Sequence, residues 1–406
     1  MARILFLAHR VPFPPNKGDK IRAFHELRHL ARSHEIWLGA PADDPADIEH
    51  LEAATRDFRG AYFGHVGPWQ TSLNLAGAAF SGAPLSVRRF YHPGLARWCR
   101  RVLTEVQPDL VFVFSSAAAQ FVQGRLSGET RLITDFVDAD AEKWRAYEAA
   151  SQGPKRWLYG AEFRRLVRYE AEIASLSAAN LFVSQTERSI FSRLVPMATG
   201  LHVVPNGVDT DFFQPRAEFG AVKPGSIVFS GTMDYKPNIE AVSWFAGDIL
   251  PLIRRRIPDA HLNIVGAKPA SAVLALGARD GITVTGSVPD MRPWLQRAQV
   301  IVTPLKIARG IQNKVLEGMA MAKPVVTTPE ALDGITAAPG RDLLVASGAA
   351  EFADQVVTVL AGKAPENLGA NARAAVIAHH SWAHHLGRLD ELIAQALHGG
   401  VKPDRG

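Results

Sequence analysis

Short apolar runs alternate with amphipathic segments through the first half of the chain. The apolar runs predict buried strands at Arg3–Ala8, Glu35–Gly39, Gly60–Phe63, Leu110–Phe114, Leu132–Phe136 and Asn180–Ser184. Helical spacing of apolar residues predicts helices between them, at Lys20–Ser33, Pro45–Arg56, Gly94–Val106 and Gly160–Leu176. Strands interleaved with helices indicate βαβ units and a parallel sheet, so we expect ligands beyond the carboxyl ends of the strands.

A second series of the same kind follows. Its predicted strands are Ile227–Phe229, His261–Val265, Ile282–Thr285, Val300–Pro304, Val325–Thr327 and Leu343–Val345. Its predicted helices are Ile239–Arg256, Pro293–Ala298, Lys314–Met321, Ala349–Leu360 and Gly369–His379. Between the series, Asn206-Gly207 is a turn signal and Thr210–Lys223 is loop-like, as expected of a crossing between domains. The expected fold class is therefore α/β, with one domain at 1–205, a second at 206–380, and a last helix and tail at 381–406.

Composition indicates the cellular location to expect and limits the classes of binding partner. The single cysteine, Cys99, excludes an internal disulfide framework and fits a reducing cytosol. The opening apolar run is too short for a secretory signal, and no apolar run is long enough to span a bilayer, so we expect a cytoplasmic location. The formal net charge of +5 favours a phosphorylated small molecule or an anionic lipid surface. No nucleic-acid-binding module is recognisable, so nucleic acid is not expected.

Each half has a glycine turn after its first strand. Gly18 precedes the first predicted helix, and Gly231 follows the strand Ile227–Phe229. Glycine lets a backbone approach a phosphate closely, and Lys236 adds a positive charge beside the second turn. A plain turn is the alternative at both places. The pattern is not GxGxxG, so no nicotinamide cofactor is indicated.

The stretch Ala308–Thr328 combines a polar, glycine-containing loop, a short helix and a buried strand. The loop would present amides at the helix N-terminus, which form a ready anion site. Lys314 and Glu317 fall in the first turns of that helix. One cation and one carboxylate suit a ligand that carries both phosphates and sugar hydroxyls. Considered alone, the stretch is explained equally well as an ordinary loop–helix–strand connection.

Four carboxylates cluster at the end of the predicted strand Leu132–Phe136, and these are Asp135, Asp138, Asp140 and Glu142. A carboxylate at this place could accept a proton or bind acceptor hydroxyls. Equally, Asp138 or Asp140 could cap the following helix, with Glu142 favoured by the helix dipole. No metal site is expected, because no His or Cys joins the cluster.

The segment Pro154–Arg168 is basic, with aromatic residues interleaved. A basic helix that carries aromatic side chains can lie on an anionic membrane surface. The alternative, and the more usual case, is a solvated helix face.

Four motifs in order carry a family resemblance, and these are Pro205–Asp209, Phe229–Met233, Val284–Asp290 and Lys314–Thr327. With them, the chain resembles the large retaining glycosyltransferase family numbered four. The likeness covers essentially the whole chain and is strongest from residue 203 to 330. It implies the GT-B fold, in which two Rossmann-like domains face each other across a cleft and the last helix crosses back to the N-terminal domain. The first half looks most like the sugar transferases of bacterial exopolysaccharide clusters linked to exosortase and PEP-CTERM sorting.

The resemblance implies roles for positions that match the family's motifs. Glu317 would hold the ribose hydroxyls of a nucleotide-sugar donor. The donor diphosphate would be met by the glycine turn and the start of the helix, at Gly231, Asn313, Lys314 and Val315. Ser287 and Val288 would lie near the nucleotide base, and Gly18 would be a backbone donor from the opposite domain. Sugar transfer would need no metal or other cofactor, because positive groups and helix amides would stabilise the leaving diphosphate.

The chain departs from the family pattern in the donor-binding loop. Arg309 stands where many relatives have the first glutamate of an E-x7-E pair, so a cation would face the donor in place of a carboxylate. Arg309 could pair with a carboxylated or phosphorylated group. Gly310, the next residue, would also contact the donor. Many relatives also carry Arg-x4-Lys after the glycine turn, and here only Lys236 stands near that place.

The catalytic region departs as well. No residue clearly matches the histidine found near the sugar in many relatives, and Asp138 lies in the corresponding region. We therefore predict Asp138 as the catalytic residue. Its neighbours Asp135, Asp140 and Lys143 are predicted to face the acceptor.

One functional hypothesis and two alternatives follow. The first is a retaining glycosyltransferase that moves a sugar from a nucleotide-sugar donor to a lipid-linked or polysaccharide acceptor, in exopolysaccharide or cell-envelope glycan biosynthesis. It would work in the cytoplasm, with peripheral contact at the inner face of the plasma membrane. A non-catalytic nucleotide-sugar-binding subunit is an alternative, because Arg309 replaces a carboxylate. A GT-B nucleotide-sugar epimerase shares the fold but is disfavoured by the four motifs.

Overall fold

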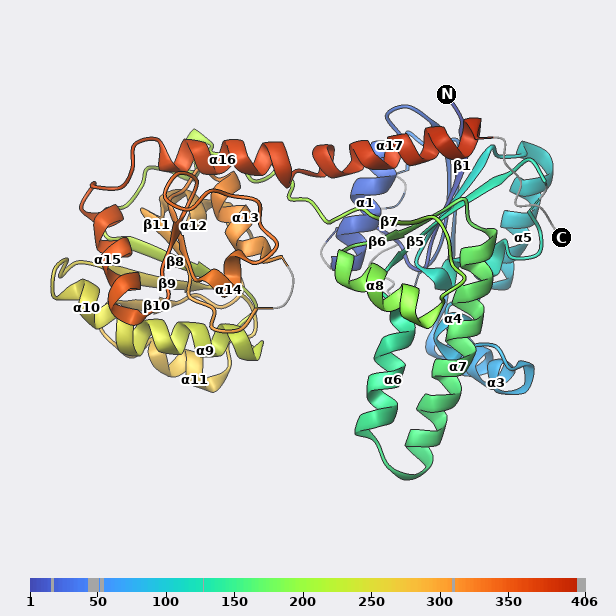
Figure 1. The fold of residues 1–406 in the computed structure, drawn as a ribbon, viewed down its shortest axis with the longest axis horizontal. Helices are drawn as coiled ribbons and strands as arrows, with labels where there is room; N and C mark the ends of the chain where they lie inside the picture. The colour runs from blue at the N-terminus through green and yellow to red at the C-terminus, as the bar shows by residue number, and fades with distance from the viewer. Residues whose placement is uncertain (16–17, 43–50, 52–54, 127, 309–310, 400–406) are drawn as a thin grey trace. The chain divides into compact units, whose positions relative to one another are not determined.

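The chain forms two compact units (Figure 1). The computed structural model describes residues 1–15, 18–42, 51, 55–126, 128–308 and 311–399. Unit 1 is Met1–Asn206 together with the residues from Leu386 on, and unit 2 is Gly207–His385. The last helix, α17 (Trp382–His398), begins in unit 2 and continues in unit 1, where Asp390 Oδ1 lies 2.8 Å from His29 Nε2.

Unit 1 is built on a seven-stranded parallel sheet with the order β3-β2-β1-β4-β5-β6-β7. Its strands are β1 (Arg3–Ala8), β2 (Glu35–Ala42), β3 (Gly60–His65), β4 (Leu110–Phe114), β5 (Arg131–Val137), β6 (Ala179–Phe182) and β7 (Leu201–Val203). All residues of β4 are buried, because it lies at the centre with helices on both faces. The predicted β6 runs too far, since Ser184 caps the next helix by accepting a hydrogen bond from the Glu187 amide at 3.2 Å.

The helices of unit 1 include several that the apolar pattern did not predict. They are α1 (Gly18–Leu30), α3 (Pro68–Ser81), α4 (Leu85–Arg88), α5 (Pro93–Arg101), α6 (Asp140–Ala150), α7 (Gly153–Leu176) and α8 (Gln185–Leu194). A short π-helix, Val102–Val106, continues α5, and a 3-10 helix, Ser116–Phe121, follows β4. Helices α6 and α7 form a hairpin that projects from the unit (Figure 1). The helix predicted at Pro45–Arg56 lies mostly outside the described residues.

Unit 2 contains a six-stranded parallel sheet with the order β10-β9-β8-β11-β12-β13. Its strands are β8 (Ser226–Ser230), β9 (His261–Val265), β10 (Ile282–Val284), β11 (Val300–Thr303), β12 (Val325–Thr327) and β13 (Leu344–Val345). Alternate residues of β8 enter different apolar clusters, Ile227 and Phe229 in one and Val228 in the other. This alternation is what a strand with helices on both faces requires.

The helices of unit 2 include the predicted ones and two, α11 and α14, that were not predicted. They are α9 (Lys236–Trp244), α10 (Leu250–Arg254), α11 (Ser271–Leu276), α12 (Arg292–Arg297), α13 (Asn313–Ala320), α14 (Pro329–Leu332), α15 (Ala349–Leu360) and α16 (Leu368–His379). The single helix predicted at Ile239–Arg256 is interrupted by a short π-helix, Phe245–Ile249. Pro251 is the second residue of the next segment, α10, and its missing N–H explains why regular α-helical bonding does not run through this point. Within the described ranges, no helix combines the length and the apolar character needed to cross a membrane.

Candidate functional site

A pocket of about 530 Å³ lies in unit 2, at the carboxyl ends of β8, β9 and β10 and the start of α13. Its volume is in the usual range for small-molecule sites. Six predicted donor-binding residues line it, and these are Gly231, Ser287, Val288, Asn313, Lys314 and Glu317. Eight further residues complete the lining, and these are Phe213, Ser230, Thr232, Asn238, Gly266, Ala267, Met291 and Ile311. The residues converge because parallel strands bring their carboxyl ends to one edge of the sheet.

Two glycines form a wall of bare backbone in this pocket. Gly231 has φ of +152° and Gly266 has φ of +155°, a conformation that side chains disfavour. A Cβ on Gly266 would lie 1.7 Å from the Gly231 carbonyl oxygen, and a Cβ on Gly231 would lie 2.8 Å from Asn238 Nδ2. The Gly231 amide in turn donates to the Val265 carbonyl at 3.1 Å. Gly266 was not predicted from the sequence, although it directly follows a strand, as Gly231 does.

Lys314 is held in the pocket by a buried amide. Its Nζ donates to Asn238 Oδ1 at 2.5 Å, while Asn238 Nδ2 donates to the Thr232 carbonyl at 2.9 Å. The ammonium also lies 4.9 Å from the centroid of the Phe229 ring, within cation–π range. Asn238 therefore positions the charge, a role that its place in the sequence did not suggest.

Burial shifts the pKa values of Lys314 and Glu317 toward neutral pH. Burial lowers the pKa of Lys314 to about 8, although the Glu317 carboxylate opposes this. Burial likewise raises the pKa of Glu317 to about 7, although the Lys314 ammonium opposes this. Near neutral pH both charges are therefore easily gained or lost, and a ligand that pairs with them would favour the charged forms.

Helix α13 starts at the pocket without a side-chain cap. Its N-cap residue is Gln312, whose side chain makes no capping hydrogen bond to the first turn. The dipole and amides of such a start favour an anion. One predicted contributor is wrong for this structure: the Val315 amide already donates to the Gln312 carbonyl at 3.0 Å, and the Val315 side chain is buried in the core.

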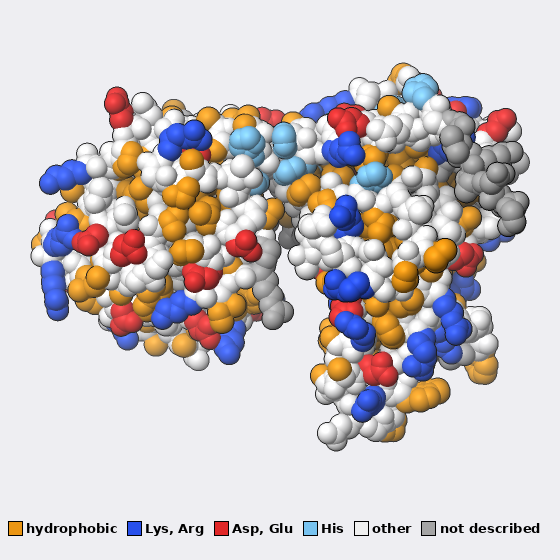
Figure 2. All heavy atoms as spheres, viewed as in Figure 1, with side chains coloured by type: hydrophobic (Ala, Val, Ile, Leu, Met, Phe, Trp, Pro, Cys, Tyr) orange, Lys and Arg blue, Asp and Glu red, His pale blue; other side chains and the backbone are white. Residues whose placement is uncertain are grey.

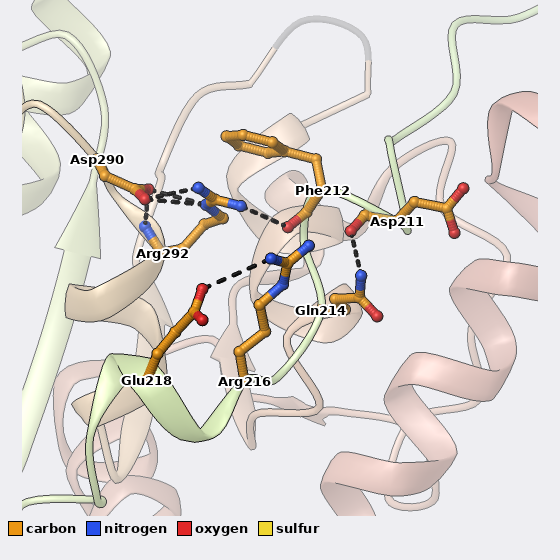
Figure 3. A network of polar contacts seen from close by, with 7 residues as sticks. All are labelled: Asp211, Phe212, Gln214, Arg216, Glu218, Asp290 and Arg292. Atoms are coloured by element: carbon orange, nitrogen blue, oxygen red, sulfur yellow. Dashed lines mark hydrogen bonds and ion pairs between the residues drawn. The ribbon is translucent and has the colours of Figure 1, made fainter.

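The loop after the unit boundary is fixed to α12 (Figure 3). Its residue Phe213 lines the pocket. The Arg292 guanidinium donates to the Phe212 carbonyl at 3.4 Å and stacks over the Phe212 ring, 3.9 Å from its centroid. The same guanidinium pairs with Asp290 at 2.8 Å, and this hydrogen bond lowers the pKa of the Asp290 carboxyl. The loop is therefore part of unit 2 and contributes an aromatic wall.

The structure does not place the four other predicted donor residues in this pocket. Lys236 begins α9, but its side chain is exposed and lies 3.7 Å from Glu240, so it is not among the residues that line the pocket. Gly18 begins α1 in unit 1. Arg309 and Gly310 lie outside the described residues.

The predicted catalytic and acceptor residues lie in unit 1, after β5. The Lys143 ammonium pairs with Asp140 at 2.7 Å and with Asp138 at 3.2 Å. Partial burial lowers the pKa of Lys143, but these carboxylates outweigh it and the net shift is upward. The N-cap of α6 is Ala139 and no side chain caps it, so the capping alternative for Asp138 and Asp140 is wrong.

The backbone before Asp138 is strained. Val137 has φ of +67°, which is unusual for a β-branched residue. Its amide donates to Asp135 Oδ1 at 3.0 Å, and the Asp138 amide donates to the Phe136 carbonyl at 2.8 Å. Strained backbone of this kind gathers at functional sites, and here it sets the position of Asp138.

The prediction that Asp135 faces an acceptor is wrong for this structure, because its side chain is fully buried. Arg22 Nε donates to Asp135 Oδ2 at 2.6 Å, and Arg22 Nη2 lies 3.2 Å from Glu26 Oε1. Burial raises the pKa of Glu26 well above its ordinary value, and Asp135 raises it further. Arg22, Glu26 and Asp135 therefore form a buried polar cluster inside unit 1.

Comparisons with known proteins agree with this arrangement. Residues 224–362 match the family described as Glycosyl transferases group 1. The chain is 25% identical over 357 residues to the GDP-mannose-dependent alpha-(1-6)-phosphatidylinositol monomannoside mannosyltransferase of Mycolicibacterium smegmatis. The alignment covers 80% of this chain and 82% of the relative. This chain is a glycosyltransferase.

Solved structures extend the likeness to the fold of the whole chain. Sucrose-phosphate synthase from Thermosynechococcus elongatus superimposes with a TM-score of 0.60 at 19% identity, over 97% of this chain and 98% of that one. Anabaena HepE in complex with UDP-glucose gives a TM-score of 0.63 at 12% identity, over 97% of this chain and 100% of that one. The glycosyltransferase thus has the predicted α/β architecture and the GT-B fold.

Proposed function

We propose that this glycosyltransferase binds a nucleotide-sugar donor in the unit 2 pocket and transfers the sugar with retention of anomeric configuration, as family-four enzymes do. The observation that carries the proposal is that Lys314 and Glu317 line one pocket, beside the bare backbone of Gly231. A cation, a carboxylate and a close backbone match the diphosphate and ribose of such a donor.

Within this proposal, each part of the pocket has a task. The α13 N-terminus and Lys314 hold the diphosphate and stabilise the charge that develops on it as the sugar leaves. Glu317 accepts hydrogen bonds from the ribose hydroxyls. Ser287 and Val288 lie along the base, and Phe213 closes the wall. Neither a metal nor another cofactor takes part in this scheme.

The acceptor in this proposal is lipid-linked or a growing polysaccharide of the cell envelope or exopolysaccharide, and it is reached at a membrane surface. The mannosyltransferase relative is named for a GDP-mannose donor and a phosphatidylinositol monomannoside acceptor, which supports the lipid-linked choice. Asp138 would act on the acceptor hydroxyl, with Asp140 and Lys143 beside it. Gly18 and Arg309 remain proposed donor contacts, and Arg309 would favour a donor sugar with an anionic substituent.

The test is a screen of nucleotide sugars for a thermal shift, followed by turnover with lipid-linked acceptors. Glu317→Ala should weaken donor binding by about 1–3 kcal/mol, because ribose hydroxyls lose their acceptor. Glu330→Ala, an exposed glutamate on α14, is the matched control and should change nothing. Donor affinity that is unchanged in Glu317→Ala would refute the donor site. A product of inverted anomeric configuration, read by NMR, would refute retention alone.

A further inference from the structure

Helix α3 turns its apolar face to solvent. Trp69, Leu73 and Phe80 share one helical face and are 79%, 53% and 94% exposed. The polar Asn74 is buried instead, and the sequence of α3 contains no charged residue. Surface helices normally bury their apolar stripe and expose polar side chains, so α3 is inverted.

This helix is firmly attached in spite of its exposure. Asn74 Nδ2 donates to the Arg89 and Tyr91 carbonyls at 3.3 and 2.7 Å. At its C-terminus, Gly82 takes a left-handed conformation and its amide donates to the Ala78 carbonyl at 3.1 Å. The apolar face is therefore displayed by an ordered, capped helix.

A second buried side chain fixes this region to α7. Glu162 accepts hydrogen bonds from the Leu85 and Ser86 amides, both at 2.8 Å, and from Ser86 Oγ at 2.7 Å. Leu85 and Ser86 belong to α4, which packs against both α3 and α7. The inverted helix is thus held in a set position beside the projecting hairpin.

The first half of α7 presents basic and apolar side chains together. Trp157 and Leu158 are 72% and 43% exposed, and Lys155 and Arg156 beside them are exposed too. Glu162, the sole acidic residue from Pro154 to Arg168, is buried, so every exposed charge of this stretch is positive. Figure 2 shows hydrophobic and basic side chains gathered on the projecting part of unit 1.

We propose that an anionic lipid bilayer binds to this docking surface, which consists of the exposed face of α3 and residues 154–168 of α7. The aromatic side chains would enter the headgroup boundary, and the basic side chains would pair with lipid phosphates. A second copy of the chain fits less well, because a two-fold contact would bring the positive stretches of α7 together. The surface deepens the proposed function, since it would hold the enzyme where a lipid-linked acceptor is found.

The experiment is co-sedimentation of the full-length protein with vesicles of phosphatidylcholine alone or mixed with phosphatidylglycerol. We expect binding to the anionic vesicles that weakens at high salt, because salt screens surface charges. Trp69→Ser/Phe80→Ser should raise the lipid concentration for half-maximal binding by about tenfold or more. Lys155→Glu/Arg156→Glu should do the same on anionic vesicles. The matched controls are Met197→Ser, which alters a side chain 90% exposed, and Arg32→Glu/Arg101→Glu, and both should bind like the unaltered protein.

Three results would overturn the proposal. The first is absence of binding to anionic vesicles, and the second is equal binding to neutral ones. The third is a concentration-dependent dimer in light scattering that Trp69→Ser/Phe80→Ser abolishes, which would assign the face to a second copy. Vesicle binding is measured without donor or acceptor, so its failure is distinct from a failure of donor binding at Glu317. Unchanged circular dichroism spectra and urea midpoints of the docking variants would confirm that they fold.

Discussion

Arg22 Nε and Asp135 Oδ2 lie 2.6 Å apart inside unit 1, and both side chains are almost completely buried. The same guanidinium donates to the Val204 carbonyl at 2.8 Å and to Asn206 Oδ1 at 3.0 Å. One charged group thus joins α1, the end of β5 and the last residues of unit 1 before the boundary. Its role in this structure is architectural.

Removing the Asp135 carboxylate should therefore lower the free energy of unfolding of unit 1. Asp135→Ala leaves a buried cation without its main partner, and such losses cost about 3–5 kcal/mol. Glu35→Ala breaks an ion pair with Arg59 that is partly exposed, and it should cost less than about 1 kcal/mol. Urea denaturation followed by circular dichroism compares the two variants. Equal, small losses in both would contradict the architectural role.

Donor binding should depend on pH on both sides of neutrality. The pKa of Glu317 is raised to about 7 in the free protein, so below that pH a bound proton must leave before ribose hydroxyls can be accepted. The pKa of Lys314 is lowered to about 8, so above that pH the cation for the diphosphate is lost. Affinity should peak between these values and fall by up to about tenfold per pH unit outside them.

Calorimetric titration with a nucleotide sugar across this pH range measures the profile. A nucleotide sugar is the suitable ligand, because its diphosphate has no terminal phosphate that titrates. Glu317→Gln should flatten the acidic limb and Lys314→Met the alkaline limb. A flat profile in the unaltered protein would exclude this pair from the donor site.

A methyl group at Gly231 should damage the pocket. Its Cβ would lie 2.8 Å from Asn238 Nδ2 and 3.3 Å from Lys314 Nζ, and its φ is unfavourable for alanine. We expect Gly231→Ala to cost about 1–3 kcal/mol in stability and to weaken nucleotide binding. Gly286→Ala shares a positive φ but has no atom within 4 Å, so it separates backbone strain from crowding. Gly286→Ala should retain most of the affinity. Similar affinity losses in both would show that crowding at Gly231 is not responsible.

Asp138→Asn should lower turnover while donor affinity stays unchanged. Asp138 does not cap α6, so folding stability should change by less than about 0.5 kcal/mol. Asp140→Asn is the matched control, because Asp140 shares Lys143 as a partner and has the same exposed fraction, 38%. Single-turnover kinetics with saturating donor compare them. Loss of activity in Asp140→Asn alone would move the catalytic role to that residue.

The apolar pattern predicted the two sheets, and the family resemblance implied that Gly231, Lys314 and Glu317 would meet one donor. Parallel strands allow this, because their carboxyl ends meet at one edge. Asn238 and Phe213 were not predicted, since their place in the pocket depends on how α9 and the loop after the boundary pack. Asp135 was misassigned, because charged side chains are expected at the surface unless a buried partner is known.

Helix α3 was missed for a related reason. Its apolar residues face outward, so they do not mark a core-facing stripe, and Gly77 lowers its helix propensity. The buried Asn74 that attaches it could be recognised only once its partners, the Arg89 and Tyr91 carbonyls, were in place.

One part of the pocket wall is backbone, where Gly231 and Gly266 lie against each other, and the rest is formed by side chains. No substitution can reshape the backbone part, because a Cβ on Gly266 would collide with the Gly231 carbonyl. Variation in ligand choice among natural or engineered versions of this enzyme is therefore confined to the other wall. A library intended to change the donor should randomise Phe213, Ser287 and Val288 and leave both glycines fixed.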